Sequence, residues 1–276
     1  MSTAPPIRAR VFAILLLTFS ALMVREFLRR QLHDAGIIGE YARDLSFLVM
    51  PPILAVLMWP ILRQHADHLR EILSFRHLTL RIVIYGFLVG LCMRIAWWSQ
   101  VVFRGSYGFL QNPNTDAIVG PTFHLHCPPL HVILLGFLVM AVLVPLIEEV
   151  THRGLLLSAF AHRGPAFAIL VSSLFFTMFH VWDSLLFVFL AGLVLGLQYW
   201  RSGALWFGMA THATYNGLIQ FDWRCLNIKW NPTPEMVPLH ASGIISAIVF
   251  VLAVSLTLWL AFNPNAGTPK APRHVD

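Results

Sequence analysis

The chain has 276 residues, of which 57% are hydrophobic and only 12% are Asp, Glu, Lys or Arg. Soluble domains carry about 25% charged residues. This composition, with a mean hydropathy of +0.70, excludes a disordered chain, a disulfide-rich scaffold and an ordinary soluble enzyme. It predicts an all-α, polytopic membrane protein. The formal net charge is +6. Most of the cations lie between or beside apolar stretches, where lipid headgroups and membrane topology explain them, so no nucleic acid partner is expected.

The apolar runs predict about eight transmembrane helices in a single bundle. In chain order they cover residues 11–24, 45–62, 78–98, 130–161, 165–181, 184–200, 203–221 and 239–262, and Pro51-Pro52 is expected to interrupt the second. Polar segments fill 99–129 and 222–238. We expect one membrane domain in three parts: N-terminal helices with a polar loop (1–129), a helical core (130–221), and a second loop with a last helix and a short tail (222–276). A small excess of Lys and Arg on the side of the N-terminus favours a cytoplasmic N-terminus.

The helix predicted at 130–161 carries charges that a membrane span should not have, within the run Glu148-Glu149-Val150-Thr151-His152-Arg153. One ionised residue at mid-membrane costs about 2.5–3.5 kcal/mol on insertion scales. Glu149 and Arg153 are four residues apart, so they share a helix face and can pair. Glu148 is rotated about 100° away from Glu149. One carboxylate is therefore held by an arginine, and the other is left free to act.

Three further polar residues are expected at the same depth in the membrane. Counted from the turns that join these helices, at about 1.5 Å per residue, Glu148, His180 and Asn216 lie roughly 21–24 Å from one membrane face. His212 lies one turn shallower than Asn216 on the same helix face. A carboxylate and an imidazole can take a proton from water, while a second histidine and an amide can stabilise an oxyanion. This set predicts a hydrolytic site in a wet cavity.

Three motifs at these positions resemble those of a known family. They are Glu148-Glu149-x-x-x-Arg153, Phe176-x-x-x-His180 and His212-x-x-x-Asn216. Together they resemble the motifs of the CAAX-protease and bacteriocin-processing (CPBP) intramembrane proteases, which are CAAX prenyl endopeptidase-like. The segment from Gln198 to Trp206 is also similar to the stretch before the third motif. The resemblance covers about 145–218, roughly a quarter of the chain.

The resemblance implies an intramembrane endopeptidase that hydrolyses a peptide bond of a membrane-associated or exported protein. By position, Glu148 is the base that activates water and His180 is its partner. Glu149 and Arg153 orient the site, and His212 and Asn216 stabilise the oxyanion. The expected partners are such a protein or peptide substrate and the lipid bilayer. The expected location is a multi-pass integral membrane protein, in the inner or plasma membrane if the chain is bacterial.

Several alternatives stay open. The family has been described both as metal-dependent and as metal-independent, and Glu148, His180 and His212 could ligate zinc. No HExxH pair is present, so no cofactor is expected and zinc is the alternative. A proton- or cation-coupled transporter would use the same buried residues. His152 lies one turn from Glu148 and could tune it or be a third metal ligand, but a packing role is favoured. Cys127 and Cys225 are hypothesised to form a disulfide across the mouth of the site.

Overall fold

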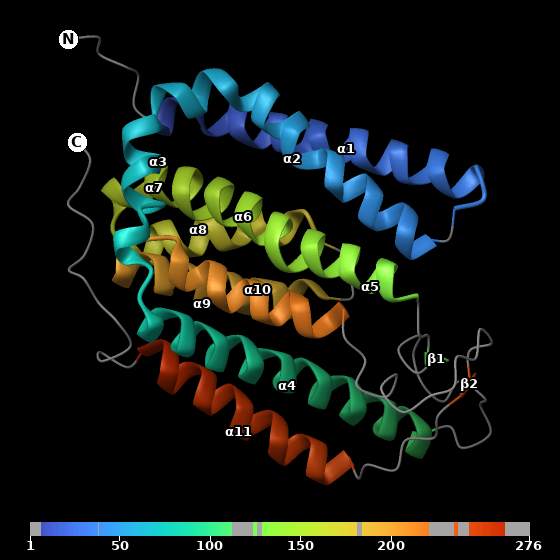
Figure 1. Cartoon of the computed structure of the whole chain (residues 1–276). Helices are drawn as coiled ribbons and strands as arrows, with labels where there is room; N and C mark the ends of the chain where they lie inside the picture. The colour runs from blue at the N-terminus through green and yellow to red at the C-terminus, as the bar shows by residue number, and fades with distance from the viewer. Residues whose placement is uncertain are drawn as a thin grey trace.

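A computed structural model of the chain shows long helices packed side by side (Figure 1). It describes residues 7–37, 39–111, 124–125, 129–180, 184–220, 235–236 and 243–262. The α-helices are α1 (Val11–Asp34), α2 (Gly39–Gln64), α3 (Ala66–Ile72), α4 (Leu80–Gln111), α5 (Leu130–Phe137), α6 (Val144–Glu149), α7 (Ser158–Phe160), α8 (Pro165–Met178), α9 (Leu185–Ser202), α10 (Trp206–Gln220) and α11 (Gly243–Phe262). Short 3-10 helices are η1 (Ile7–Arg10), η2 (Phe75–His77) and η6 (Ala161–Arg163), and two-residue strands β1 (His124–Leu125) and β2 (Glu235–Met236) pair in antiparallel fashion.

The predicted all-α, polytopic architecture is confirmed, and each of the eight predicted spans corresponds to a helical stretch. Among the described residues, six helices are long and apolar enough to cross a membrane, and α8 is a shorter apolar helix. At about 1.5 Å per residue, the 14 residues of α8 reach about 21 Å, less than the roughly 30 Å of a bilayer core. Helix α8 therefore ends at a depth where a full span would still be inside the membrane.

The structure corrects the N-terminal boundaries. Helix α2 runs without a break through Pro51, Pro52 and Pro60, so the predicted interruption is wrong. Proline fixes a φ that suits a helix, and membrane helices tolerate the lost amide donor. Helix α1 continues to Asp34 because Glu26 pairs with the arginines that follow it at i+3 and i+4.

The helix predicted to end at residue 98 continues as α4 to Gln111. The polar segment predicted from residue 99 therefore begins later. Hydropathy alone marks where a helix leaves the apolar layer, whereas the backbone hydrogen bonds of a helix can continue into water. The long predicted helix at 130–161 is present as α5, α6 and α7, with two π-helical segments between them, η4 (Leu138–Leu143) and η5 (Val150–Leu157).

The bundle has three parts when viewed from the side (Figure 1). The helices of the predicted core, α5 to α10, lie in the middle, with α1 and α2 packed on one side and α4 and α11 on the other. Two turns at one end of the bundle use left-handed backbone, at Gly164 (φ 91°) and Gly203 (φ 65°), which glycine adopts without strain. These turns reverse the chain, so α8 and α10 both begin at the end of the bundle towards which α6 and α9 run.

Close packing of α4 against α10 fixes the position of the third motif. Gly86 and Gly90 are four residues apart and face α10, and a Cβ on Gly90 would lie 2.5 Å from the carbonyl oxygen of Thr211. Small residues at this spacing let membrane helices approach closely. Thr211 directly precedes His212, so this contact sets how far His212 reaches into the bundle.

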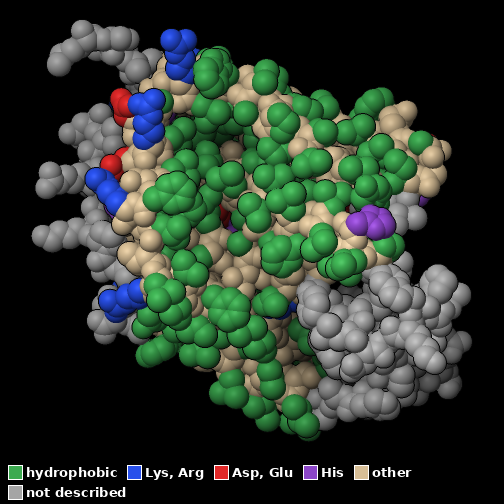
Figure 2. Space-filling view, viewed as in Figure 1, with side chains coloured by type: hydrophobic (Ala, Val, Ile, Leu, Met, Phe, Trp, Pro, Cys, Tyr) green, Lys and Arg blue, Asp and Glu red, His purple; other side chains and the backbone are tan. Residues whose placement is uncertain are grey.

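The outer surface is that of a membrane protein. Large apolar side chains on many helices are exposed, including Phe12, Val56 and Ile244 at 74–78%, and Figure 2 shows them as a nearly continuous apolar face. Arginine side chains gather at the end of the molecule where α3 lies (Figure 2). An exposed apolar belt of this extent with charge at one end is typical of a bilayer-embedded bundle. The chain is an integral, multi-pass membrane protein.

Helix α3 lies outside the predicted spans and contacts the segment that follows the first motif. His68 Nε2 donates to the carbonyl oxygen of Gly154 at 3.0 Å and lies 3.2 Å from Ser158 Oγ. Gly154 belongs to η5, where i→i+5 bonding leaves a carbonyl without a helical amide when the α pattern resumes. Burial lowers the pKa of His68, and burial together with the neighbouring His68 and Arg10 side chains lowers the pKa of His65.

The lowered pKa values of these two histidines predict a loss of stability in mild acid. When the folded pKa is depressed, the unfolded chain binds a proton that the folded chain does not, so stability falls as the pH drops below about 6.5. We expect the Tm of the purified protein in detergent to decrease from pH 7.5 to pH 5.5. His68→Gln keeps a donor towards Gly154 and should flatten that decrease. An unchanged slope in the variant would show that His68 does not contribute.

Candidate active site

The first motif lies on a helix turn that is framed by unusual backbone. Helix α6, which ends with Glu148 and Glu149, is bounded by the π-helical segments η4 and η5. Pro145 stands in the first turn of α6 and cannot donate a backbone hydrogen bond, which favours a local change of helical pattern. Widened turns of this kind are frequent at functional sites.

Glu149 and Arg153 form the buried pair that their spacing predicts. Both side chains are fully buried, and Arg153 Nη1 donates to Glu149 Oε1 at 3.1 Å. Arg153 Nη2 donates to the carbonyl oxygen of Gly192 at 3.2 Å, and the guanidinium lies 4.4 Å from the centre of the Phe176 ring. The arginine therefore joins the first motif to α9 and to the second motif on α8.

The Glu149 carboxylate also contacts the third motif. His212 Nδ1 donates to Glu149 Oε1 at 3.0 Å. Glu149 Oε2 has no hydrogen-bond partner among the described residues, and a Cβ on Gly208 would lie 2.8 Å from it. Glycine at position 208 is what lets α10 come this close to the carboxylate.

His212 also faces the second glutamate. Its Nε2 lies 3.5 Å from Glu148 Oε2, a distance for electrostatic attraction that leaves Oε2 without a hydrogen-bond partner among the described residues. The Glu148 side chain is 20% exposed, whereas that of Glu149 is fully buried. The two neighbouring carboxylates therefore differ as expected: one is neutralised in the interior, and the other opens onto a cavity.

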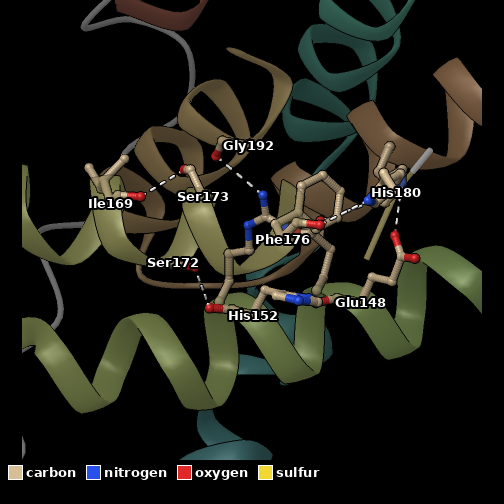
Figure 3. Close-up of polar contacts among 11 residues, drawn as sticks. Glu148, His152, Ile169, Ser172, Ser173, Phe176, His180 and Gly192 are labelled. Atoms are coloured by element: carbon tan, nitrogen blue, oxygen red, sulfur yellow. Dashed lines mark hydrogen bonds and ion pairs between the residues drawn. The ribbon is translucent and has the colours of Figure 1, made fainter. Parts of the chain in front are cut away.

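His180 stands just past the end of α8 and caps it. Its Nδ1 donates to the carbonyl oxygen of Phe176 at 2.8 Å, and its backbone amide donates to Thr177. This bond fixes the ring and leaves Nε2 as the acceptor of the neutral imidazole. Figure 3 shows the bond from His180 to the Phe176 carbonyl oxygen.

Phe176 is the packing centre of the site. Its buried ring touches His152, His180 and His212, with centroid distances of 5.2, 4.7 and 5.9 Å. Together with the contact to Arg153, four basic side chains are arranged around one aromatic ring. This explains why a phenylalanine stands four residues before His180 in the second motif.

A cavity of about 530 Å³ joins these groups. Glu148, His180, His212 and Asn216 all line it, as predicted from their common depth. Most of the wall is apolar and aromatic, and much of it comes from helices that show no motif. The residues that α1, α2 and α4 contribute are Thr18, Leu22, Arg25, Phe47, Met50, Met93, Arg94, Trp97 and Trp98.

This wall was not predicted from the sequence, although two of its arginines stand out there. Arg25 and Arg94 are arginines within or beside apolar stretches, and each lies over an aromatic ring, Phe47 and Trp98 respectively. Intramembrane arginines commonly face a cavity rather than lipid. The aromatic residues gave no such signal, because their spacing is that of any lipid-facing helix.

The structure brings all six candidate residues together, with one change of neighbour. The imidazole within ion-pair distance of Glu148 is that of His212, and no such contact is found between Glu148 and His180 among the described residues. His180 lines the same cavity. The cause is the shared turn of α6, which lets His212 lie between the two consecutive carboxylates.

Two further expectations concern metal and disulfide chemistry. Within the described residues, no group of three or more His, Cys, Asp or Glu is placed to hold a metal ion. The hypothesised Cys127–Cys225 bridge lies outside the part of the chain that the structure describes.

Fold and site together define a multi-pass membrane protein with a carboxylate–imidazole centre buried among its helices. Residues 130–218, about a third of the chain, match the family model described as type II CAAX prenyl endopeptidase Rce1-like. That segment holds all three motifs, and the match supports a similarity to CAAX protease-like (CPBP) proteins, which are a protease family. No curated protein and no solved structure matches the chain.

Proposed function

We propose that this protein is an intramembrane endopeptidase in which Glu148 activates water against a peptide bond. The observation that carries the proposal is the different treatment of two adjacent carboxylates. Glu149 is buried and neutralised by Arg153, whereas Glu148 opens onto a cavity lined by imidazoles. A hydrolase needs a fixed base with access to water, and this arrangement supplies one.

The formal charges around His212 favour one additional proton in this group. Two ionised carboxylates and one guanidinium leave Glu148, Glu149 and Arg153 with a net formal charge of −1, and a proton shared with His212 brings the group to zero. His212 then donates from Nδ1 to Glu149 and presents Nε2–H on the side of Glu148. With the amide of Asn216 one turn away, this donor suits the negative oxygen of a tetrahedral intermediate.

The proposed reaction uses these groups in turn. Glu148 takes one proton from water as the water oxygen bonds to the carbonyl carbon of the substrate. The carbonyl oxygen becomes an oxyanion, which His212 and Asn216 stabilise. His180, with Nε2 unprotonated, relays the proton from Glu148 to the leaving nitrogen as the C–N bond breaks. Arg153 and Glu149 hold His212 in place throughout.

We further propose that the substrate is a membrane-associated or exported protein and that the mechanism is of the glutamate type. The apolar wall of the cavity suits a peptide that reaches the site within or beside the bilayer. The burial of Glu149 and the anchoring of His212 between two carboxylates support a metal-independent site. A zinc-dependent mechanism would require Glu148, His180 and His212 to rearrange around an ion.

Purified protein in liposomes tests this function. A quenched fluorescent peptide with a membrane anchor should be cleaved, and cleavage should persist in the presence of a zinc chelator. Loss of cleavage that returns with added zinc would contradict the glutamate-type mechanism. Proton or cation flux without any cleavage would instead support a transporter and contradict the endopeptidase.

A further inference from the structure

His152 is the one buried imidazole in the site that the mechanism above does not use. It lies one helical turn after Glu148, its exposed fraction is 3%, and it lines the same cavity. Its ring stands edge-on to Phe176 and Phe179, at centroid distances of 5.2 and 5.9 Å. Figure 3 shows the ring between the helix that carries Glu148 and the ring of Phe176.

The hydrogen bond of one ring nitrogen defines the role of the other. Nδ1 lies 2.9 Å from the main-chain carbonyl oxygen of Glu148. A carbonyl can only accept, so Nδ1 carries the proton and Nε2 of the neutral ring presents a lone pair. That Nε2 is buried and has no hydrogen-bond partner among the described residues.

A buried acceptor without a donor is costly and calls for a partner from outside the chain. The donor must fit a cavity whose other groups are Glu148, His180 and His212. A water molecule has two protons, and the proposed reaction uses only one of them. Resting on the proposed function, we infer that His152 Nε2 accepts a hydrogen bond from the attacking water, so that His152 is a further catalytic residue.

In this arrangement the water is held from two sides. One O–H points to the Glu148 carboxylate and is broken as the oxygen attacks. The other O–H points to His152 Nε2 and stays intact, so the ring gains no proton in the step. The oxygen lone pair is thereby turned to the carbonyl carbon. Because Nδ1 is hydrogen-bonded to the backbone of Glu148, the positions of Glu148 and His152 around the water are coupled.

A pair of variants separates the two ring nitrogens. The amide of Asn reaches the level of Nδ1, and the amide of Gln reaches the level of Nε2. His152→Asn therefore keeps the donor to the Glu148 carbonyl and loses the acceptor in the cavity, while His152→Gln does the reverse. We expect His152→Asn to lower kcat by about 10-fold to 100-fold with little change in KM. His152→Gln should stay within about 10-fold of the wild type.

The measurement is steady-state cleavage of the anchored peptide in liposomes, with the Tm of each variant as a check of folding. A folded His152→Asn that cleaves normally, or that changes only KM, would overturn the inference. So would an equal loss in both variants, or a larger loss in His152→Gln, because these results assign the effect to packing or to Nδ1. A wild-type protein that cleaves nothing would overturn the proposed function itself.

Discussion

Glu148→Gln is expected to reduce peptide cleavage by about 10³-fold while leaving the protein folded. The amide has nearly the same shape as the carboxylate but cannot take a proton, and a positioned general base contributes roughly 10²-fold to 10⁴-fold. Glu148 is partly exposed and is not a member of the buried pair. Its charge is therefore needed for the reaction rather than for the fold. Single-turnover cleavage in liposomes, with the Tm measured on the same preparation, provides the test.

The matched control for this variant is Glu71→Gln. Glu71 also pairs with a cation, Arg76, but it is exposed and lies at the end of α3. This change should leave both cleavage and Tm near the wild-type values. A Glu148→Gln protein that cleaves at the rate of Glu71→Gln would show that Glu148 is not the base.

Arg153→Met is expected to destabilise the protein by about 3–5 kcal/mol. The substitution leaves the fully buried Glu149 without its cation, and breaking a buried pair from one side costs about this much. It also removes the bond to the Gly192 carbonyl and the contact with Phe176. Chemical unfolding in mixed micelles should show the loss as a lower midpoint.

The double variant Glu149→Gln/Arg153→Met separates the two roles of the pair. A neutral amide beside a methionine needs no counter-ion, so most of the lost stability should return. Cleavage should not return, because the negative charge of Glu149 that faces Nδ1 of His212 is gone. The exposed pair of Arg70 and Asp67 provides the control, since Arg70→Met should leave the unfolding midpoint unchanged. Recovery of activity in the double variant would show that the pair has only a structural role.

Much of the site could be predicted because the relative positions of its residues follow from local helix geometry. The four-residue spacing of Glu149 and Arg153 gives a pair on any helix, and the buried bond at 3.1 Å follows from it. Residue counts from the turns placed Glu148, His180 and Asn216 at one depth, and all three line one cavity. Turn positions and rise per residue are properties of the chain itself.

The other features of the site depend on how separate helices pack, and the local sequence does not reveal this packing. The choice of His212 as the neighbour of Glu148 depends on the close approach of α10, which Gly208 and Gly90 permit. The π-helical turns around α6 arise from packing and from Pro145, and apolar periodicity does not reveal them. Likewise, the early end of α8 at Met178 is set by the cap that His180 provides.

The most direct test of the central claim is to map new peptide termini. Liposomes that contain extracted membrane proteins are incubated with wild-type protein or with Glu148→Gln, and the termini are identified by mass spectrometry. We expect a defined set of new termini, from proteins or peptides at the membrane, that appear only with the wild type. Identical sets of termini with both proteins would contradict it.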